Sequence, residues 1–298
     1  MDDFLIVSDN AGFSEPELEE YLRKNPRSRI FPELVKARIT YDDEEIELSS
    51  EELSARIESG KYQPGRLKSA SASLEAAADV VREAAQSFSG AIIVLSTSSY
   101  ISSSLASVMM NAVNTVTEET GRKNIRYVDS RATSHGQVLL LKLMDSGEVD
   151  LADDNAIMLA SRHIHHTFTE PDLSFAVRSG RYNGIGRTLV SGAATLMKAH
   201  RWLPWMFLPF DNSLKVDFSR LHTEKRMLAI WAGLFEECSV RPEVIIEFAG
   251  EHEFELANKF AKMLTKVGAK PEIQWLSQPI MVHTGPVLAW HAYLDFLR

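Results

Sequence analysis

The sequence contains a single cysteine, Cys238, among its 298 residues. One thiol cannot form an intrachain disulfide, and a zinc site built from several thiolates is excluded. This scarcity of cysteine fits a reducing compartment. The N-terminus has Asp2 and Asp3 where a secretory signal would carry Lys or Arg, so we expect no targeting segment and a cytoplasmic protein.

Long apolar runs and an excess of basic residues are also missing. No uninterrupted apolar run approaches the roughly 18 residues that a helix needs to span a bilayer, so we expect no membrane span. Lys and Arg number 32 against 41 for Asp and Glu, which leaves a net charge of −9. A broad nucleic-acid surface needs clustered Lys and Arg to neutralise phosphates, so nucleic acid is not an expected partner.

The sequence lacks the common motifs of nucleotide-binding and hydrolytic enzymes. It has neither the Gly-x-x-x-x-Gly-Lys-Ser/Thr phosphate loop nor the Gly-x-Ser-x-Gly elbow of α/β hydrolases. Gly184 and Gly186 have the spacing of two glycines in a dinucleotide fingerprint, but the third glycine is absent. We therefore expect that the chain alone is not an enzyme.

Short apolar runs alternate with amphipathic segments along the chain, in which hydrophobic residues make up 45% of the total. Strands that alternate with helices indicate a mostly parallel sheet with helical crossovers, and the length suits two domains. The acidic segment 145–154 is the expected boundary. We predict an α/β fold with a parallel-sheet domain flanked by helices at 1–150 and a mixed-sheet α/β domain at 151–298.

The individual elements follow from the periodicity of the apolar residues. In the first domain we predict strands at 4–7, 91–95 and 124–128, a hairpin of 35–41 with 46–48, and helices at 15–24, from 50, at 73–86, from 105 and up to 144. In the second domain we predict helices at 154–162, 172–178, 187–199, 223–237 and 252–267, and strands at 164–168, 202–208, 214–218, 244–248, 272–276 and 279–283.

A hydroxyl-rich loop follows the predicted strand at 91–95. It has seven Ser or Thr side chains in the nine residues 96–104, including Ser98, Ser99 and Ser102. The apolar pattern of a helix begins directly after it, and a helix N-terminus offers unpaired N–H groups and a positive dipole end. One Ser or Thr is enough for an ordinary N-cap. The density of hydroxyls therefore favours a site for a carboxylate or a phosphate.

Two further segments carry candidate anion-binding groups. Arg181 lies between glycines in the turn 179–186, where its guanidinium can pair with an anion or face solvent. His283 and Thr284 end the predicted strand at 279–283, either as a capped turn or as donors to an anion. A small-molecule phosphotransferase or hydrolase that uses His283 as acid–base or nucleophile stays open as an alternative.

The histidines at 163, 165 and 166 invite a metal interpretation, because His163 and His165 are expected on one face of a strand. No nearby pair of carboxylates completes a ligand set for a zinc ion or another transition metal. Surface histidines are the favoured interpretation, and no metal is expected.

Six short motifs, in their order and spacing, resemble those of the DegV family of bacterial fatty-acid-binding proteins over essentially the whole chain. The motifs are VSDN at 7–10, SASAS at 69–73, SSYISSS at 98–104, VDSR at 128–131, SGR at 179–181 and VHTGP at 282–286.

This resemblance implies a two-domain α/β protein that buries one long-chain fatty acid as its ligand, with the carboxyl group near the domain interface and no cofactor. It also implies that the carboxylate is contacted by Ser69, Ser98, Ser99, Ser102, Arg181, His283 and Thr284. In the family, a separate dihydroxyacetone-kinase-like subunit forms the acyl phosphate from ATP. That fatty acid kinase subunit is therefore an expected partner, in agreement with the missing phosphate loop.

Overall fold

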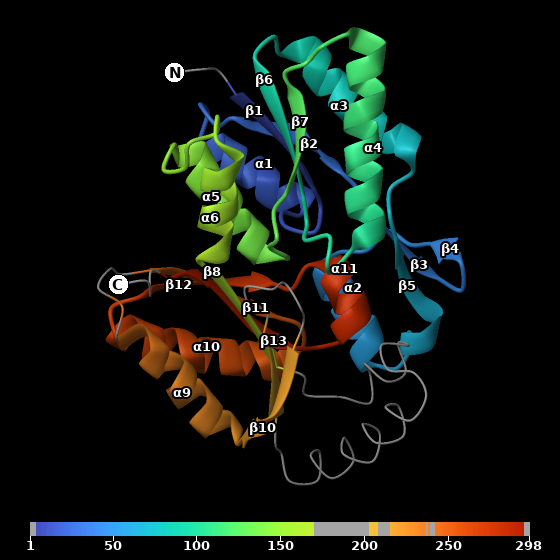
Figure 1. Ribbon diagram of the computed structural model, residues 1–298. Helices are drawn as coiled ribbons and strands as arrows, with labels where there is room; N and C mark the ends of the chain where they lie inside the picture. The colour runs from blue at the N-terminus through green and yellow to red at the C-terminus, as the bar shows by residue number, and fades with distance from the viewer. Residues whose placement is uncertain (1–3, 170–202, 208–214, 237, 239–241, 295–298) are drawn as a thin grey trace. The chain divides into compact units, whose positions relative to one another are not determined.

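The computed structural model describes residues 4–169, 203–207, 215–236, 238 and 242–294 (Figure 1). The chain divides into two compact units, Met1–Arg38 with Ala70–Ile164 and Ile39–Ser69 with His165–Arg298. These units differ from the predicted ranges 1–150 and 151–298, because the chain leaves the first unit after Arg38 and returns to it at Ala70. No shift in composition marks this excursion in the sequence.

The first unit is built on a parallel sheet with the strand order β2-β1-β6-β7. Its strands are β1 (Phe4–Asp9), β2 (Ile30–Val35), β6 (Ala91–Ser96) and β7 (Ile125–Asp129). Its helices are α1 (Glu15–Lys24), α3 (Leu74–Ser87), α4 (Ser103–Thr120), α5 (His135–Ser146) and α6 (Asp154–Arg162). In Figure 1, α3 and α4 lie together on one side of the sheet, and α1 and α5 lie on the other side. The predicted parallel sheet flanked by helices is confirmed.

The core of the first unit explains why these segments form these elements. The four residues 92–95 of β6 are fully buried, as expected for a central strand that is covered on both faces. On α4, the fully or nearly buried Leu105, Met109, Ala112 and Val116 recur every three or four residues. That spacing places them on one helix face, which packs into the core with α3 and the sheet.

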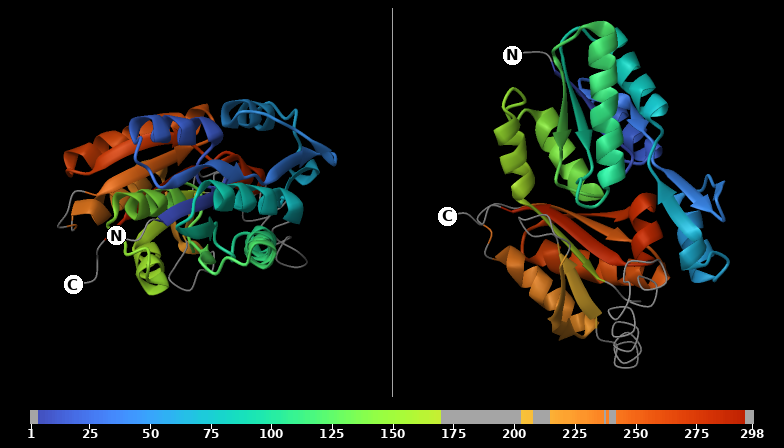
Figure 2. Two further views of the ribbon diagram at one scale, coloured as in Figure 1. Left: turned by 90° about the horizontal axis from the view of Figure 1, so that it is seen from above. Right: turned by 45° about the vertical axis from the view of Figure 1, so that its right-hand side comes forward.

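The second unit contains a six-stranded mixed sheet with the strand order β10-β9-β8-β13-β11-β12. Its strands are β8 (Ile164–Thr169), β9 (Leu203–Phe207), β10 (Lys215–His222), β11 (Glu243–Phe248), β12 (Lys270–Trp275) and β13 (Leu288–Tyr293). The helices α9 (Glu224–Glu236) and α10 (Glu251–Lys266) cover one face of this sheet (Figure 2). Trp231 and Trp290 meet edge to face in the core between them, with ring centroids 6.1 Å apart. The predicted mixed sheet is confirmed.

The segment 39–69 adds a smaller layer to the second unit. It contains α2 (Ser50–Glu58), a short 3-10 turn (Pro64–Arg66) and most of a three-stranded sheet with the order β4-β3-β5. The strands are β3 (Arg38–Tyr41), β4 (Glu44–Glu45) and β5 (Leu67–Ala70). Asp42 and Asp43 both have positive φ angles, 55° and 67°, as the type I′ turn of a two-residue hairpin requires.

Several predicted elements are wrong. The predicted strand at 279–283 is the helix α11 (Gln278–Thr284), which has a proline in its first turn. Proline fits there because the first-turn N–H groups have no partner within the helix. β2 and β13 were not predicted, and the hairpin strands are β3 and β4 rather than 35–41 and 46–48. The predicted helices at 172–178 and 187–199 lie outside the described residues.

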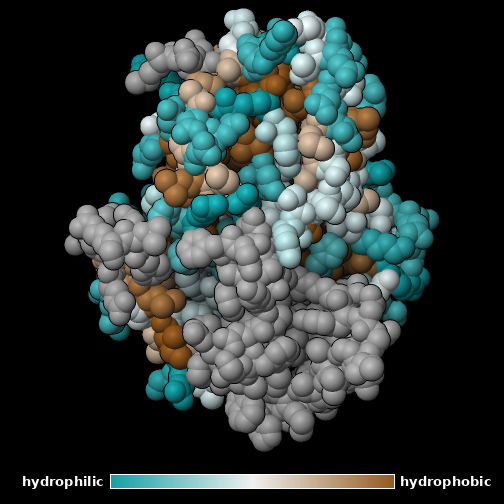
Figure 3. Space-filling model, viewed as in Figure 1, coloured by the Kyte–Doolittle hydropathy of each residue, from teal (hydrophilic) through white to brown (hydrophobic). Residues whose placement is uncertain are grey.

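The surface of the first unit shows no broad apolar face in the view of Figure 3, where hydrophobic residues form small patches among hydrophilic ones. Exposed large hydrophobic side chains in this unit are separated along the chain, such as Leu74 on α3, Tyr100 in the loop before α4 and Leu159 on α6. None of the helices in the described part of the chain is long and apolar enough to cross a membrane.

Candidate functional site

The hydroxyl-rich loop follows β6 at the carboxyl edge of the parallel sheet, where the ends of β1, β6 and β7 meet. Ligands of open α/β sheets bind beyond this edge. Asp9, at the end of β1, holds the loop from below: its carboxylate accepts hydrogen bonds from the backbone N–H of Thr97 at 2.6 Å and of Ala11 at 2.9 Å. The predicted serine loop is therefore anchored to the neighbouring strand.

Asp9 is fully buried, and burial raises the pKa of its carboxyl to about 6. Hydrogen bonds from Thr97, Ala11 and the Gln137 side chain act in the opposite direction, because they stabilise the charged form. The carboxyl group that anchors the loop therefore titrates near pH 6.

Ser98 and Ser99 have different surroundings. Ser98 is fully buried, its N–H donates to the carbonyl oxygen of Ala132 at 2.7 Å, and its Oγ accepts from the N–H of Tyr100 at 3.3 Å. Ser99 is exposed, and its hydroxyl donates to the carboxylate of Asp129 at 2.5 Å. Both hydroxyls therefore shape the loop, and the exposed one is already paired with a carboxylate.

Ser102 is the N-cap residue of α4, but its side chain makes no capping hydrogen bond. The first turn of this 18-residue helix therefore has no capping bond from the side chain that usually provides it. Close by, the hydroxyls of Ser71 and Ser104 lie 2.6 Å apart. This end of α4 combines the positive end of a helix dipole with hydroxyl groups, as the sequence predicts for an anion site.

In the second unit, the structure brings Ser69 and His283 together. The Oγ atom of Ser69 on β5 lies 2.8 Å from Nε2 of His283 on α11, although the two residues are 214 positions apart in the chain. The helix α11 is held by the side-chain amide of Gln278, which donates to the carbonyl oxygen of Leu48. His283 is exposed and Ser69 is half-buried, so both can meet a ligand.

Thr284, the neighbour of His283, faces inward. It is buried, and its hydroxyl donates to the carbonyl oxygen of Ile280 at 3.1 Å, one turn back in the same helix. Gly285, which has a φ of 70°, ends the helix directly afterwards. Thr284 thus helps to shape the end of α11. Arg181, the remaining predicted contact, lies outside the described residues.

The histidines at 163–166 do not form the arrangement expected of them. His163 is the C-cap residue of α6 and precedes β8, so it is not on a strand face with His165. His166 is buried and lies 2.8 Å from His291. Within the described ranges, no group of His, Cys, Asp and Glu is arranged to hold a metal ion.

That His291 is the buried partner of His166 was not predicted from the sequence. The signal was a His within the otherwise uncharged strand Leu288–Tyr293, and likewise a Glu within the strand Glu243–Phe248. Polar side chains at such positions must have partners in the fold, because an unpaired buried polar group is costly.

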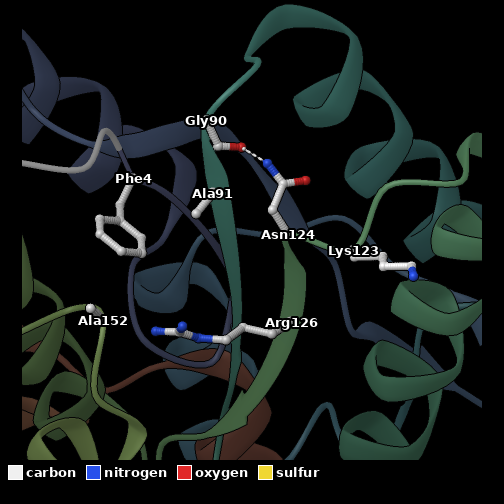
Figure 4. Close-up of a pocket in the computed structure, with 7 residues that line it drawn as sticks. All are labelled: Phe4, Gly90, Ala91, Lys123, Asn124, Arg126 and Ala152. Atoms are coloured by element: carbon white, nitrogen blue, oxygen red, sulfur yellow. Dashed lines mark hydrogen bonds between the residues drawn. The ribbon is translucent and has the colours of Figure 1, made fainter.

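A hollow of about 470 Å³ in the first unit lies at the opposite edge of the parallel sheet from the serine loop. It is lined by Phe4, Gly90, Ala91, Lys123, Asn124, Arg126 and Ala152. Figure 4 shows the Arg126 side chain extending toward Ala152 and the Lys123 side chain directed elsewhere. Arg126 is already paired, with the carboxylate of Asp154 at 3.0 Å and with the carbonyl oxygen of Leu151. The hollow therefore does not present a free guanidinium to a ligand.

No known family model matches the sequence, and no curated protein matches it. Solved structures do match. A fatty acid binding DegV family protein from Streptococcus agalactiae has 18% identity and a TM-score of 0.73, covering 99% of this chain and 100% of that chain. A stearic acid-binding protein from Eubacterium ventriosum has 18% identity and a TM-score of 0.74, covering 99% and 98%.

A third similar structure is DegV, a fatty acid binding protein from Bacillus subtilis, with 17% identity and a TM-score of 0.72 over 99% of this chain and 100% of that chain. At such identities the likeness concerns the fold, and it extends over both units. The chain therefore has the fold of the DegV family, which its sequence motifs indicate.

Proposed function

We propose that this protein binds a long-chain fatty acid and holds its carboxylate at the pair formed by Ser69 and His283. The observation that carries the proposal is the 2.8 Å distance between Ser69 Oγ and His283 Nε2. Both residues belong to motifs that resemble those of the DegV family. Proteins with this fold are described as binding stearic acid and, in Eubacterium eligens, heptadecanoic acid.

The pair suits a carboxylate for a chemical reason. When Nε2 of His283 carries no hydrogen, the Ser69 hydroxyl donates its hydrogen to that nitrogen. When Nε2 carries a hydrogen, as in the imidazolium, that N–H donates to Ser69 Oγ, and the hydroxyl hydrogen can bond to an incoming anion. The positive charge near the C-terminal end of α11 is also favourable to the helix dipole. Binding of an anion and protonation of the pair therefore stabilise each other.

We also propose the serine loop as a second carboxylate contact, through Ser98, Ser99 and Ser102 at the N-terminus of α4. Arg181 and Thr284 complete the proposed set of residues. We further propose that the protein acts in the cytoplasm and presents the carboxyl group of the bound fatty acid to a dihydroxyacetone-kinase-like subunit. That subunit would form the acyl phosphate. The missing phosphate loop supports a separate kinase, since this chain has no such means of holding ATP.

Native mass spectrometry of the purified protein tests the proposal. We expect a co-purifying acyl ligand, because a buried acyl chain contributes about 0.8 kcal/mol for each CH₂ group and dissociates slowly. Delipidated protein should take up added stearate or oleate in equimolar amount. A protein that carries no acyl ligand and binds neither acid would overturn the proposed function.

Replacing His283 by Ala is expected to weaken fatty acid binding about 10- to 100-fold, since a hydrogen bond to a charged group is worth roughly 1.5–3 kcal/mol. Ser69→Ala should act in the same direction with a smaller effect. A fluorescent fatty acid titrated into each variant measures the loss. His252→Ala is the matched control, because His252 is an exposed histidine of the same unit that pairs with Glu224 instead. Affinities unchanged in both test variants would place the carboxylate elsewhere.

The same pair supports a second candidate function. A Ser hydroxyl 2.8 Å from an imidazole nitrogen is also the geometry of a nucleophile with its general base. A hydrolase or phosphotransferase would turn over acyl or phosphate esters, and Ser69→Ala and His283→Ala would abolish that turnover. Fatty acid binding without turnover by the isolated chain separates the binding function from the enzymatic one.

A further inference from the structure

Three neighbouring strands of the second unit carry a buried chain of polar side chains. Glu247 on β11, His291 on β13 and His166 on β8 are 0%, 0% and 3% exposed. Glu247 Oε2 lies 2.5 Å from His291 Nε2, and His291 Nδ1 lies 2.8 Å from His166 Nδ1. The strands β8, β13 and β11 are adjacent in the sheet, as Figure 1 shows.

The carboxylate sets the direction of this hydrogen-bonded chain. An ionised Glu247 can only accept, so Nε2 of His291 carries a hydrogen, and in a neutral ring Nδ1 then presents a lone pair. That lone pair accepts the Nδ1–H of His166. With Nδ1 protonated, neutral His166 has an unprotonated Nε2 that can only accept a hydrogen bond. Burial holds the pKa of His166 well below its usual range, in agreement with a neutral ring.

The last atom of this hydrogen-bonded series, His166 Nε2, has no donor among the described residues. Among the residues that the structure describes, none makes a hydrogen bond with His166 Nε2, and this atom is buried. Most buried polar atoms have a partner, and an acceptor without one costs free energy. Glu247 and His291 fix the orientation of the His166 ring and so the direction of its Nε2 lone pair. The ring of Phe168 packs against His291, with ring centroids 5.5 Å apart. Such an aligned, unoccupied acceptor is what a ligand with a donor group requires.

We propose that His166 Nε2 accepts a hydrogen bond from an O–H group of a bound lipid, with Glu247 and His291 as positioning residues. The inference rests on the proposed function and adds a polar contact for the acyl chain to those proposed for the carboxylate. The donor is a hydroxyl on the acyl chain, because the carboxyl group of the same molecule is assigned to the Ser69–His283 pair. A neutral acceptor in a buried place favours such a neutral donor over a carboxylate, which has no hydrogen to give.

Binding measurements on full-length wild type and His166→Phe test the proposal. The probes are stearic acid and a set of hydroxystearic acids with the hydroxyl at different carbons. If the chain hydroxyl is the donor, one hydroxystearic acid should bind wild type about three- to tenfold more tightly than stearic acid, and His166→Phe should lose that preference. An equal loss of affinity for all acids would place the carboxyl group at His166 instead and would overturn the inference.

Identical affinities of wild type and His166→Phe for every acid would overturn the inference. His252→Phe is the control, because His252 is a histidine of the same unit that is not hydrogen-bonded to Glu247, His291 or His166. Nitrogen NMR of wild type keeps the proposal testable if His166→Phe does not fold: the Nε2 resonance of His166 should move when lipid is added, and a resonance that stays in place contradicts the proposal. Wild type that binds no acid at all would count against the proposed function instead.

Discussion

Replacing Arg122 by Ala is expected to lower the free energy of unfolding by about 3 kcal/mol, because several hydrogen bonds to a charged group are lost together. The guanidinium donates to the carbonyl oxygens of Ala85, Phe88 and Gly90, each at 2.6 Å. The carbonyl of Ala85 lies in the last turn of α3, and those of Phe88 and Gly90 lie between α3 and β6, so no helical N–H is available for them. Arg122 thus closes the connection between a helix and the central strand. Urea unfolding of the two proteins measures the difference.

Two further variants separate geometry from charge. Arg122→Lys keeps the charge but not the planar fork that reaches three carbonyls, so it should recover less than half of the loss. Lys123→Ala removes an exposed charge at the next position and should change stability by less than about 0.5 kcal/mol. An Arg122→Ala protein as stable as Lys123→Ala would show that these carbonyls are well solvated without the arginine.

The stability of the protein should fall as the pH rises through the range in which Asp9 titrates. Burial raises the pKa of Asp9 from 3.8 to about 6. The folded protein therefore holds this proton more tightly than the unfolded chain does, so the contribution is fully present below pH 4. It is lost as the pH rises past about 6. The total loss from this group is about 3 kcal/mol, at about 1.4 kcal/mol for each pKa unit.

Asp9→Asn isolates this effect, since the variant cannot titrate at position 9 while all other carboxyl groups remain. The variant also loses one acceptor among the bonds from Thr97, Ala11 and Gln137, which lowers its stability at every pH. The difference between the two unfolding free energies should therefore shift by about 2.5 kcal/mol in favour of the variant between pH 4 and pH 7.5. A difference that is constant with pH would show that folding does not raise the pKa of Asp9.

The sequence predicts elements well where local signals agree. The helix Glu15–Lys24 matches its predicted range because Ser14 and Glu17 form a capping box at its start and a proline lies in its first turn. The strand predicted at 279–283 failed because three apolar residues in a row fit a strand or a short helix equally well. There the proline in the first turn was the better signal. β13 was missed because its His291 interrupts the apolar pattern.

The site could be predicted only in part. Hydroxyl density identified the serine loop, and its anchoring by Asp9 and Asp129 follows from parallel strands that end at one edge. The meeting of Ser69 with His283 is a property of the tertiary fold, since no local rule relates residues 214 positions apart. The chain from Glu247 to His166 depends on the order of three strands, which the sequence does not reveal.

The excursion of residues 39–69 has a consequence for protein synthesis. The first unit has all of its residues once Ile164 has been added to the growing chain. The helix α2, in contrast, contacts α11, which begins at Gln278. At about 5–20 residues per second, roughly 10–40 s separate the synthesis of these two helices. Ser69 is likewise synthesised long before His283. A nascent chain can therefore form the parallel sheet of the first unit well before it can form the pair proposed to hold the lipid.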